Sequence, residues 1–126
     1  MSCLFHSLCR FVSHGDYKKL RQDICNFLDA NQPLLDDLTI KEIAELDGIT
    51  KEQYIQNMRD DNTWGGAPEI KAFCEMYKVI VKVVILSSHK VIDFTPRIAD
   101  DPTQKIDRYV IISWNGSHFE PVLNKK

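Results

Sequence analysis

Apolar residues recur at intervals of three and four along residues 1–77 of the chain. This spacing places apolar side chains on one face of a helix and therefore predicts a helical N-terminal part. A first helix is predicted from Cys3 to Val12, with a break at His14-Gly15. A second is predicted to start at the N-cap Asp16 and to end at Asn31-Gln32-Pro33; its apolar stripe consists of Leu20, Ile24, Phe27 and Leu28.

Capping signals predict three further helices. The pairs Thr39/Glu42 and Thr50/Gln53 have the spacing of capping boxes at the starts of two short helices. Proline in the first turn of Ala67-Pro68-Glu69 begins the last helix. Its inward face is predicted to hold Ile70, Phe73, Cys74 and Tyr77.

The pattern changes to strands in the last 49 residues. Residues 79–86 are rich in β-branched side chains and carry one charge, Lys82, which predicts a well-buried strand. The remaining predicted elements are a strand at 91–94, a loop at 96–106, a strand at 109–114, a tight turn at Asn115-Gly116 and a strand at 118–123.

These elements together predict an α+β fold. Helices from the N-terminal two-thirds are expected to pack on a small, mostly antiparallel or mixed β-sheet formed by the C-terminal third. A length of 126 residues is enough for one hydrophobic core, and no internal repeat or linker divides the sequence. We therefore expect residues 1–126 to form a single domain.

Composition narrows the class of protein. Apolar residues make up 44% and charged residues 27% of the chain, as in globular domains. The net charge of −2 shows no excess of basic residues of the kind that indicates nucleic-acid binding. No apolar stretch reaches the length of a membrane span, and no secretory leader is recognised. The cysteines are interpreted as reduced thiols. We therefore expect an intracellular, cytoplasmic monomer that binds neither nucleic acid nor membrane.

Cys3 and His118 are the candidate reactive pair. A thiol in the first turn of a helix faces unpaired N–H groups and the positive end of the helix dipole, which favour thiolate. His118 follows a turn at the start of a strand and is a candidate general base. Glu120, on the same strand face, and Asn115, across the turn, are candidates for orienting the imidazole.

Each of these residues also has a structural interpretation. Cys3 alone is typical of a small core side chain, and a single histidine such as His118 is often structural. Zinc ligation by Cys3, His6, Cys9 and His14 is disfavoured, because Cys9 lies about 240° around a continuous helix from Cys3.

Three segments together resemble the ovarian tumour (OTU) family of cysteine proteases. Cys3-Leu4-Phe5-His6-Ser7-Leu8 resembles the nucleophile segment, and His118-Phe119-Glu120-Pro121 resembles the terminal histidine motif. The stretch 61–70, which contains Trp64-Gly65-Gly66, resembles the middle block. The segments occur in the family's order and span essentially the whole chain.

This resemblance implies a papain-related fold and a deubiquitinase that needs no metal or cofactor. It implies Cys3 as nucleophile, His118 as general base, and ubiquitin, polyubiquitin or a ubiquitin-like modifier as partner. Trp64-Gly65-Gly66 would be a structural turn beside the active-site groove, or alternatively a direct substrate contact. Residues 38–60 would form part of the ubiquitin-binding surface, with Ile40, Ile43 and Tyr54 as apolar contacts or, alternatively, as core.

The chain departs from the family pattern at two places. The Asp-Gly that precedes the family's nucleophile is absent, because only Met1 and Ser2 come before Cys3. Either the catalytic domain is truncated just before its nucleophile, or this member lacks those oxyanion donors and is a weakly active or inactive ubiquitin-binding module. Glu120 stands where the family often has aspartate or asparagine.

Overall fold

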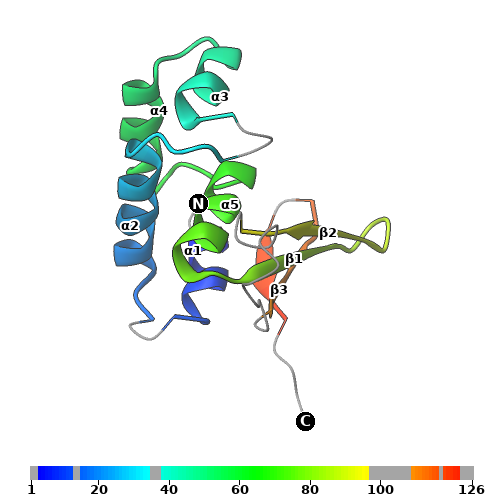
Figure 1. Ribbon diagram of the computed structural model, residues 1–126. Helices are drawn as coiled ribbons and strands as arrows, with labels where there is room; N and C mark the ends of the chain where they lie inside the picture. Colours follow the sequence, from blue (N-terminus) through cyan, green and yellow to red (C-terminus); the bar gives the residue numbers. More distant parts are fainter. Residues whose placement is uncertain (1–2, 13–14, 35–37, 97–108, 117, 123–126) are drawn as a thin grey trace, which may run out of the picture.

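The computed structural model describes residues 3–12, 15–34, 38–96, 109–116 and 118–122. Within these residues the chain forms helices first and strands second, as the sequence predicts (Figure 1). The helices are α1 (Cys3–Cys9), α2 (Tyr17–Asp29), α3 (Ile40–Leu46), α4 (Lys51–Met58) and α5 (Ala67–Tyr77). The strands are β1 (Ile80–Ile85), β2 (Lys90–Phe94), β3 (Tyr109–Trp114) and β4 (Phe119–Pro121).

Side-chain caps fix the starts of the helices where the sequence predicts them. The Asp16 carboxylate accepts the N–H groups of Lys18 and Lys19 at the start of α2. Thr39 and Glu42 form the predicted capping box of α3. The Thr50 hydroxyl oxygen caps α4. These caps satisfy backbone donors that have no partner inside a helix.

The first helix is shorter than predicted and ends at Cys9 rather than at Val12. Phe11 donates its N–H to the Leu8 carbonyl and Val12 to the Cys9 carbonyl, at 3.0 and 3.3 Å. These bonds span three residues rather than four, so the chain tightens into a turn. Both side chains still pack against the core, which is why their apolar spacing resembles a longer helix.

The four strands form one mixed sheet in the order β2-β1-β3-β4. β1 and β3 are parallel, whereas β2 and β4 pair antiparallel at the two edges. The predicted α+β class with a mixed sheet is confirmed. Of the predicted loop at 96–106, residues 97–106 lie outside the described residues.

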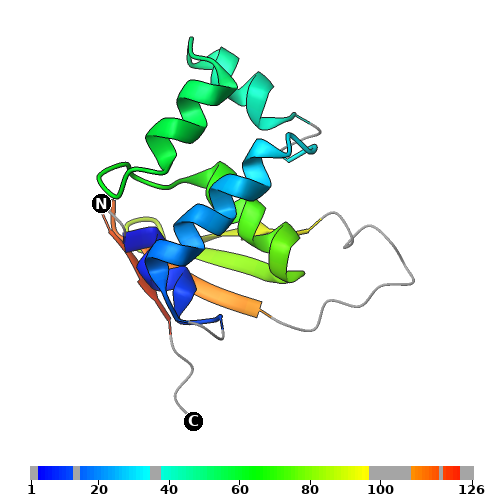
Figure 2. The ribbon, with the colours of Figure 1, turned by 90° about the vertical axis from the view of Figure 1, so that its left-hand side faces the viewer.

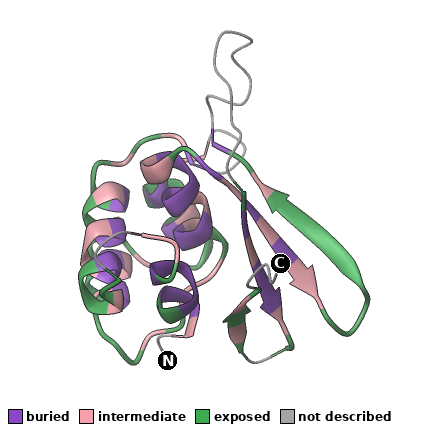
Figure 3. Cartoon of the chain, turned by 90° about the horizontal axis from the view of Figure 1, so that it is seen from below, coloured by how far each residue is buried: buried purple, intermediate pink, exposed green. Residues whose placement is uncertain are grey.

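Among the described residues the helices cover one face of the sheet, so the prediction of a well-buried first strand is half wrong. Val81 and Val83 of β1 face the helices and are buried. Ile80 and Lys82 alternate with them and are partly exposed. The Lys82 ammonium lies 3.1 Å from the carboxylate of Asp93, its cross-strand partner. Figure 3 shows the exposed β1–β2 hairpin projecting beyond the helices.

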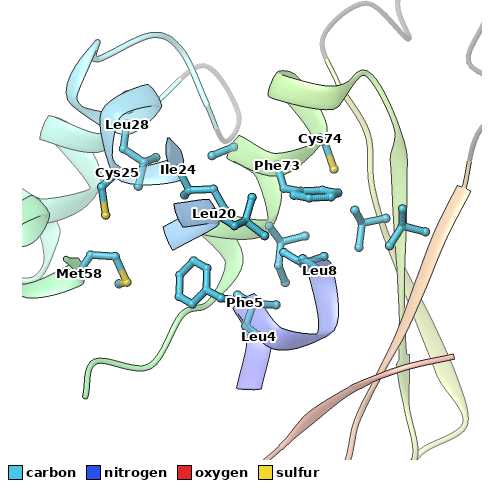
Figure 4. Packing of buried hydrophobic residues seen from close by; sticks show 14 of the residues in the cluster. Leu4, Phe5, Leu8, Leu20, Ile24, Cys25, Leu28, Met58, Phe73 and Cys74 are labelled. Atoms are coloured by element: carbon cyan, nitrogen blue, oxygen red, sulfur yellow. The ribbon is translucent and has the colours of Figure 1, made fainter. Parts of the chain in front are cut away.

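Helices α1 and α5 lie against the sheet, and α2 packs on both of them (Figure 2). α4 packs on α2, and α3 on α4. The core joins these layers: Figure 4 shows Phe5 and Leu8 of α1, Leu20 of α2 and Phe73 of α5 gathered together. Among the described residues, no helix has the length and apolar character needed to cross a lipid bilayer.

Candidate active site

Cys3 is the first residue of α1 and its side chain is partly exposed. The helix buries Leu4, Phe5 and Leu8, so positions 3, 6 and 10 are left on the open face. The Ser7 hydroxyl donates to the Cys3 carbonyl at 2.8 Å, which fixes the first turn. The helix therefore presents the Cys3 thiol at the surface while anchoring its backbone in the core.

The other three cysteines are buried thiols. Burial raises the pKa of Cys25 to about 11 and that of Cys74 to about 12. Burial also raises the pKa of Cys9. Loss of hydration disfavours a thiolate at these positions. Cys3 is thus the one cysteine that is not classed as buried.

An open pocket of about 490 Å³ adjoins Cys3. His6 of α1 and Arg10, the residue after that helix, line it together with Tyr17, Phe119 and Pro121. The His6 ring stacks on Tyr17 with 3.7 Å between ring centroids. His6 is therefore a surface residue that lines the pocket. Among the described residues, no group of three or more histidine, cysteine or acidic side chains is arranged to hold a metal ion.

His118 is exposed and immediately precedes β4. Its N–H donates to the Asn115 side-chain oxygen at 2.7 Å, and its carbonyl accepts the Asn115 N–H at 3.2 Å. Asn115 was predicted to orient the imidazole, but these contacts fix the backbone of His118. Glu120, the other candidate, is exposed opposite Ser113 of β3. The role of either side chain toward the ring stays a prediction.

Strand β4 packs against α1, which brings the histidine strand to the cysteine helix. Phe119, directly after His118, lines the same pocket as Cys3. Phe119 also lines a second, apolar groove of about 160 Å³ between the start of α5 and the sheet, with Ile70, Val83 and Trp114 among its other walls. Phe119 therefore borders both hollows.

The turn Trp64-Gly65-Gly66 lies between α1 and His118. The Trp64 and His118 ring centroids are 6.2 Å apart, at an interplanar angle of 41°. On the other side, a β-carbon at Gly65 would lie 2.7 Å from Leu4 Cδ2 and 3.1 Å from the Phe5 ring. A β-carbon at this position would overlap the buried side chains of Leu4 and Phe5, so glycine fits the close packing of the turn on α1.

Replacing Gly65 by alanine should therefore destabilise the fold by about 1–3 kcal/mol, the usual cost of overpacking a core. Gly66→Ala is the matched control, because a β-carbon there would meet only Glu69 Oε1, at 4.0 Å. Urea unfolding of both variants checks this expectation. Equal losses in the two variants would show that the contact with Leu4 and Phe5 is not what requires glycine.

Glu69 anchors this turn from inside the protein. Its carboxylate accepts the Gly66 N–H at 2.7 Å and the Tyr54 hydroxyl at 2.6 Å. Burial raises the pKa of Glu69 to about 7, although both hydrogen bonds oppose the shift. Burial and the adjacent carboxylate raise the pKa of Tyr54 as well. The hydroxyl of Tyr54 is therefore directed toward Glu69 rather than toward a substrate.

Ile40 is 1% exposed and belongs to the core, so its predicted alternative role as a core residue fits and a surface contact does not. Ile43 and Tyr54 are partly buried and pack against that core. For all three predicted contact residues, the alternative interpretation as core residues therefore fits the structure best. Asp60 is a turn residue, since its carboxylate accepts the Asn62 N–H.

The raised pKa of Glu69 predicts a pH-dependent stability. Protonated Glu69 favours the folded state, so its contribution is complete below the unfolded pKa of 4.5 and is lost as the pH rises to about 7. Over this window the free energy of unfolding should fall by about 3 kcal/mol relative to Glu69→Gln. Glutamine is a suitable reference because it does not titrate, and its amide can accept from Gly66 and donate to Tyr54.

Urea unfolding at several pH values between 4.5 and 8 measures this difference. Parallel curves for the wild type and Glu69→Gln would contradict a raised pKa of Glu69.

Comparison with known proteins places this arrangement in a family. The sequence model described as OTU-like cysteine protease matches residues 2–120. The chain is 28% identical over 130 residues to "Ubiquitin thioesterase OTU1" of Danio rerio and 28% identical over 120 residues to that of Saccharomyces cerevisiae. The matches cover 96% and 94% of this chain, but only 38% and 35% of those relatives.

Solved structures share the fold. An OTU domain in complex with ubiquitin superposes with a TM-score of 0.73 at 26% identity, over 95% of this chain and 62% of that one. An OTU deubiquitinase from Wolbachia pipientis wMel gives a TM-score of 0.67 at 24% identity, over 98% and 82%. The family match spans both Cys3 and His118, and the fold places their elements together. The chain belongs to the family of OTU-like cysteine proteases.

Proposed function

We propose that the chain is a deubiquitinating cysteine protease that hydrolyses the bond after the C-terminal glycine of ubiquitin. The observation that carries the proposal is the partly exposed thiol of Cys3 at the head of α1, in a pocket that the residue after His118 also lines. Family membership supports the chemistry. Relatives named ubiquitin thioesterase and a 26% identical OTU domain solved with ubiquitin support the substrate.

In the proposed mechanism His118 accepts the proton of the Cys3 thiol, and the thiolate attacks the carbonyl carbon of the terminal glycine. His118 then protonates the amine nitrogen, the C–N bond breaks, and ubiquitin remains as a thioester on Cys3. A water molecule gives a proton to His118 and attacks the thioester. Its hydrolysis releases the ubiquitin carboxylate and restores the Cys3 thiol. No metal or cofactor takes part in these steps.

The two hollows beside Phe119 give the substrate chain room on either side of the reacting bond. The Trp64 ring packs beside the His118 ring and limits the positions that the imidazole can take. Asn115 fixes the backbone from which the imidazole projects. In this proposal residues 1–126 form the catalytic domain. The four unpaired thiols support an intracellular, cytoplasmic location.

Hydrolysis of ubiquitin carrying a C-terminal fluorogenic amide tests the proposal. The same assay on a panel of ubiquitin-like modifiers identifies the preferred one. Release of fluorophore from ubiquitin is the expected result. Saturable ubiquitin binding without release would instead support a ubiquitin-binding module, and neither binding nor release with any modifier would overturn the proposal.

A further inference from the structure

Arg21 is a fully buried arginine in the middle of the amphipathic helix α2. It belongs to the buried face of the helix, whose other members, such as Leu20 and Ile24, are apolar. Burying a guanidinium is costly unless its donors are satisfied, and arginine stays charged in proteins. The groups that satisfy Arg21 therefore indicate why the charge lies there.

One set of partners lies on the loop between α4 and α5. Arg21 donates to the carbonyls of Met58 and Thr63, at 2.7 and 3.0 Å. It also reaches the Asp61 carbonyl at 3.4 Å, and its Nε lies 3.6 Å from the Asp61 carboxylate. These contacts span the loop from the end of α4 to the residue before Trp64. A single buried side chain thus sets the path of the loop.

The other partner is Phe5 of α1, whose ring centroid lies 4.1 Å from the guanidinium carbon. Figure 4 shows Phe5 and Met58 directed toward one another from α1 and α4. Phe5 is two residues from Cys3, and it also contacts the position of Gly65. Arg21 therefore touches both the helix that carries the thiol and the loop whose Trp64 packs beside His118.

We propose that Arg21 is a positioning residue that sets the separation of Cys3 and His118 from within the core. It acts through Phe5 on the first turn of α1 and through Thr63 and Trp64 on the imidazole. The planar fork of arginine bonds several carbonyls at once, whereas a lysine ammonium is a point charge that cannot hold both the loop and the ring in place. The inference rests on the proposed roles of Cys3 and His118.

The test compares Arg21→Lys with the matched variant Arg59→Lys. Arg59 also joins α2 to the end of α4, but its guanidinium donates to the side chains of Gln22 and Asn26 of α2 rather than to the loop carbonyls. Both variants keep a positive charge at the substituted position and lose the planar guanidinium that donates several hydrogen bonds. Both variants are assayed at a temperature at which circular dichroism and urea unfolding show them to be fully folded.

The first readout is the pH dependence of Cys3 alkylation by iodoacetamide, which needs no assumption about the substrate. A well-placed imidazolium favours the thiolate at low pH, so Arg21→Lys should move the midpoint of alkylation upward by about one pH unit. Arg59→Lys should leave it in place. The second readout is turnover of fluorogenic ubiquitin, where kcat should fall about 10–100-fold in Arg21→Lys with little change in KM.

If the midpoint of Cys3 alkylation moves upward in Arg21→Lys but not in Arg59→Lys, the positioning role is supported even if ubiquitin proves not to be the substrate. Equal midpoints in the wild type and both variants would overturn it, whether or not ubiquitin is cleaved. If Arg21→Lys does not fold, Asp61→Asn replaces it, because this half-exposed carboxylate pairs with Arg21 Nε. That variant should give a smaller shift in the same direction, and no shift would again overturn the role.

Discussion

Cys3→Ala should lower hydrolysis of a fluorogenic ubiquitin amide by about 10³-fold or more while the protein stays folded. Cys3 is partly exposed at the head of α1, so removal of its sulfur leaves the core packing of Leu4 and Phe5 intact. Without the thiol no thioester forms, and the remaining groups offer only binding and orientation. Initial rates at saturating substrate measure the loss.

Cys25→Ala is the matched control. Its thiol is buried and has a raised pKa, and it lines neither hollow beside Phe119. This variant should lose some stability, because a buried sulfur leaves a small cavity, but it should keep its turnover at a temperature where it is folded. Activity that survives in Cys3→Ala and disappears in Cys25→Ala would place the nucleophile elsewhere.

His118→Asn should reduce kcat by about 10²–10⁴-fold, the usual contribution of a general acid–base group. The exposed imidazole precedes the short strand β4, and its contact with Trp64 is at the surface. The substitution therefore removes proton transfer with little loss of stability. The plot of kcat against pH should also lose the part that arises from protonation of the general base.

His89→Asn is the corresponding control. His89 lies in the turn between β1 and β2 with φ of 59°, a left-handed conformation that asparagine adopts readily. Its turnover should match that of the wild type. If His118→Asn retained more than a tenth of the wild-type kcat, another group would be the general base.

Local signals in the sequence were sufficient to predict the order and class of the elements. Thr39 and Glu42 lie three residues apart, so the capping box is visible in the sequence and is confirmed in α3. The end of α1 was predicted wrongly, because Val12 continues to face the core after the helix has tightened into a turn. Apolar spacing records burial, and a tight turn can bury residues at helical spacing too.

Sequence reasoning did not identify Arg21 and Glu69 as residues that hold the site in place, because their partners are distant in the sequence or are backbone groups. The acceptors of Arg21 are backbone carbonyls 37 to 42 residues away, which carry no side-chain signature. Glu69 is bonded by Tyr54, 15 residues earlier, and by the backbone of Gly66. Contacts of this kind depend on how α2, α4 and α5 pack, and periodicity within a single element does not encode that packing.

The candidate pair itself was predicted from residue type and family resemblance, whereas its surroundings required the fold. Trp64-Gly65-Gly66 was recognised as a turn, but its position between α1 and His118 follows from the contacts of Gly65 with Leu4 and of Trp64 with the imidazole. The sequence also offered Asn115 as an orienting residue, and the structure gives it a bond to the His118 backbone.

The central claim is that Cys3 is the nucleophile of a deubiquitinase. The most direct measurement treats the protein with ubiquitin bearing a C-terminal electrophile and maps the adduct by mass spectrometry after digestion. The account predicts one covalent ubiquitin per chain, attached to the peptide that contains Cys3 and absent in Cys3→Ala. An adduct on another residue, or none at all from a folded protein, would contradict it.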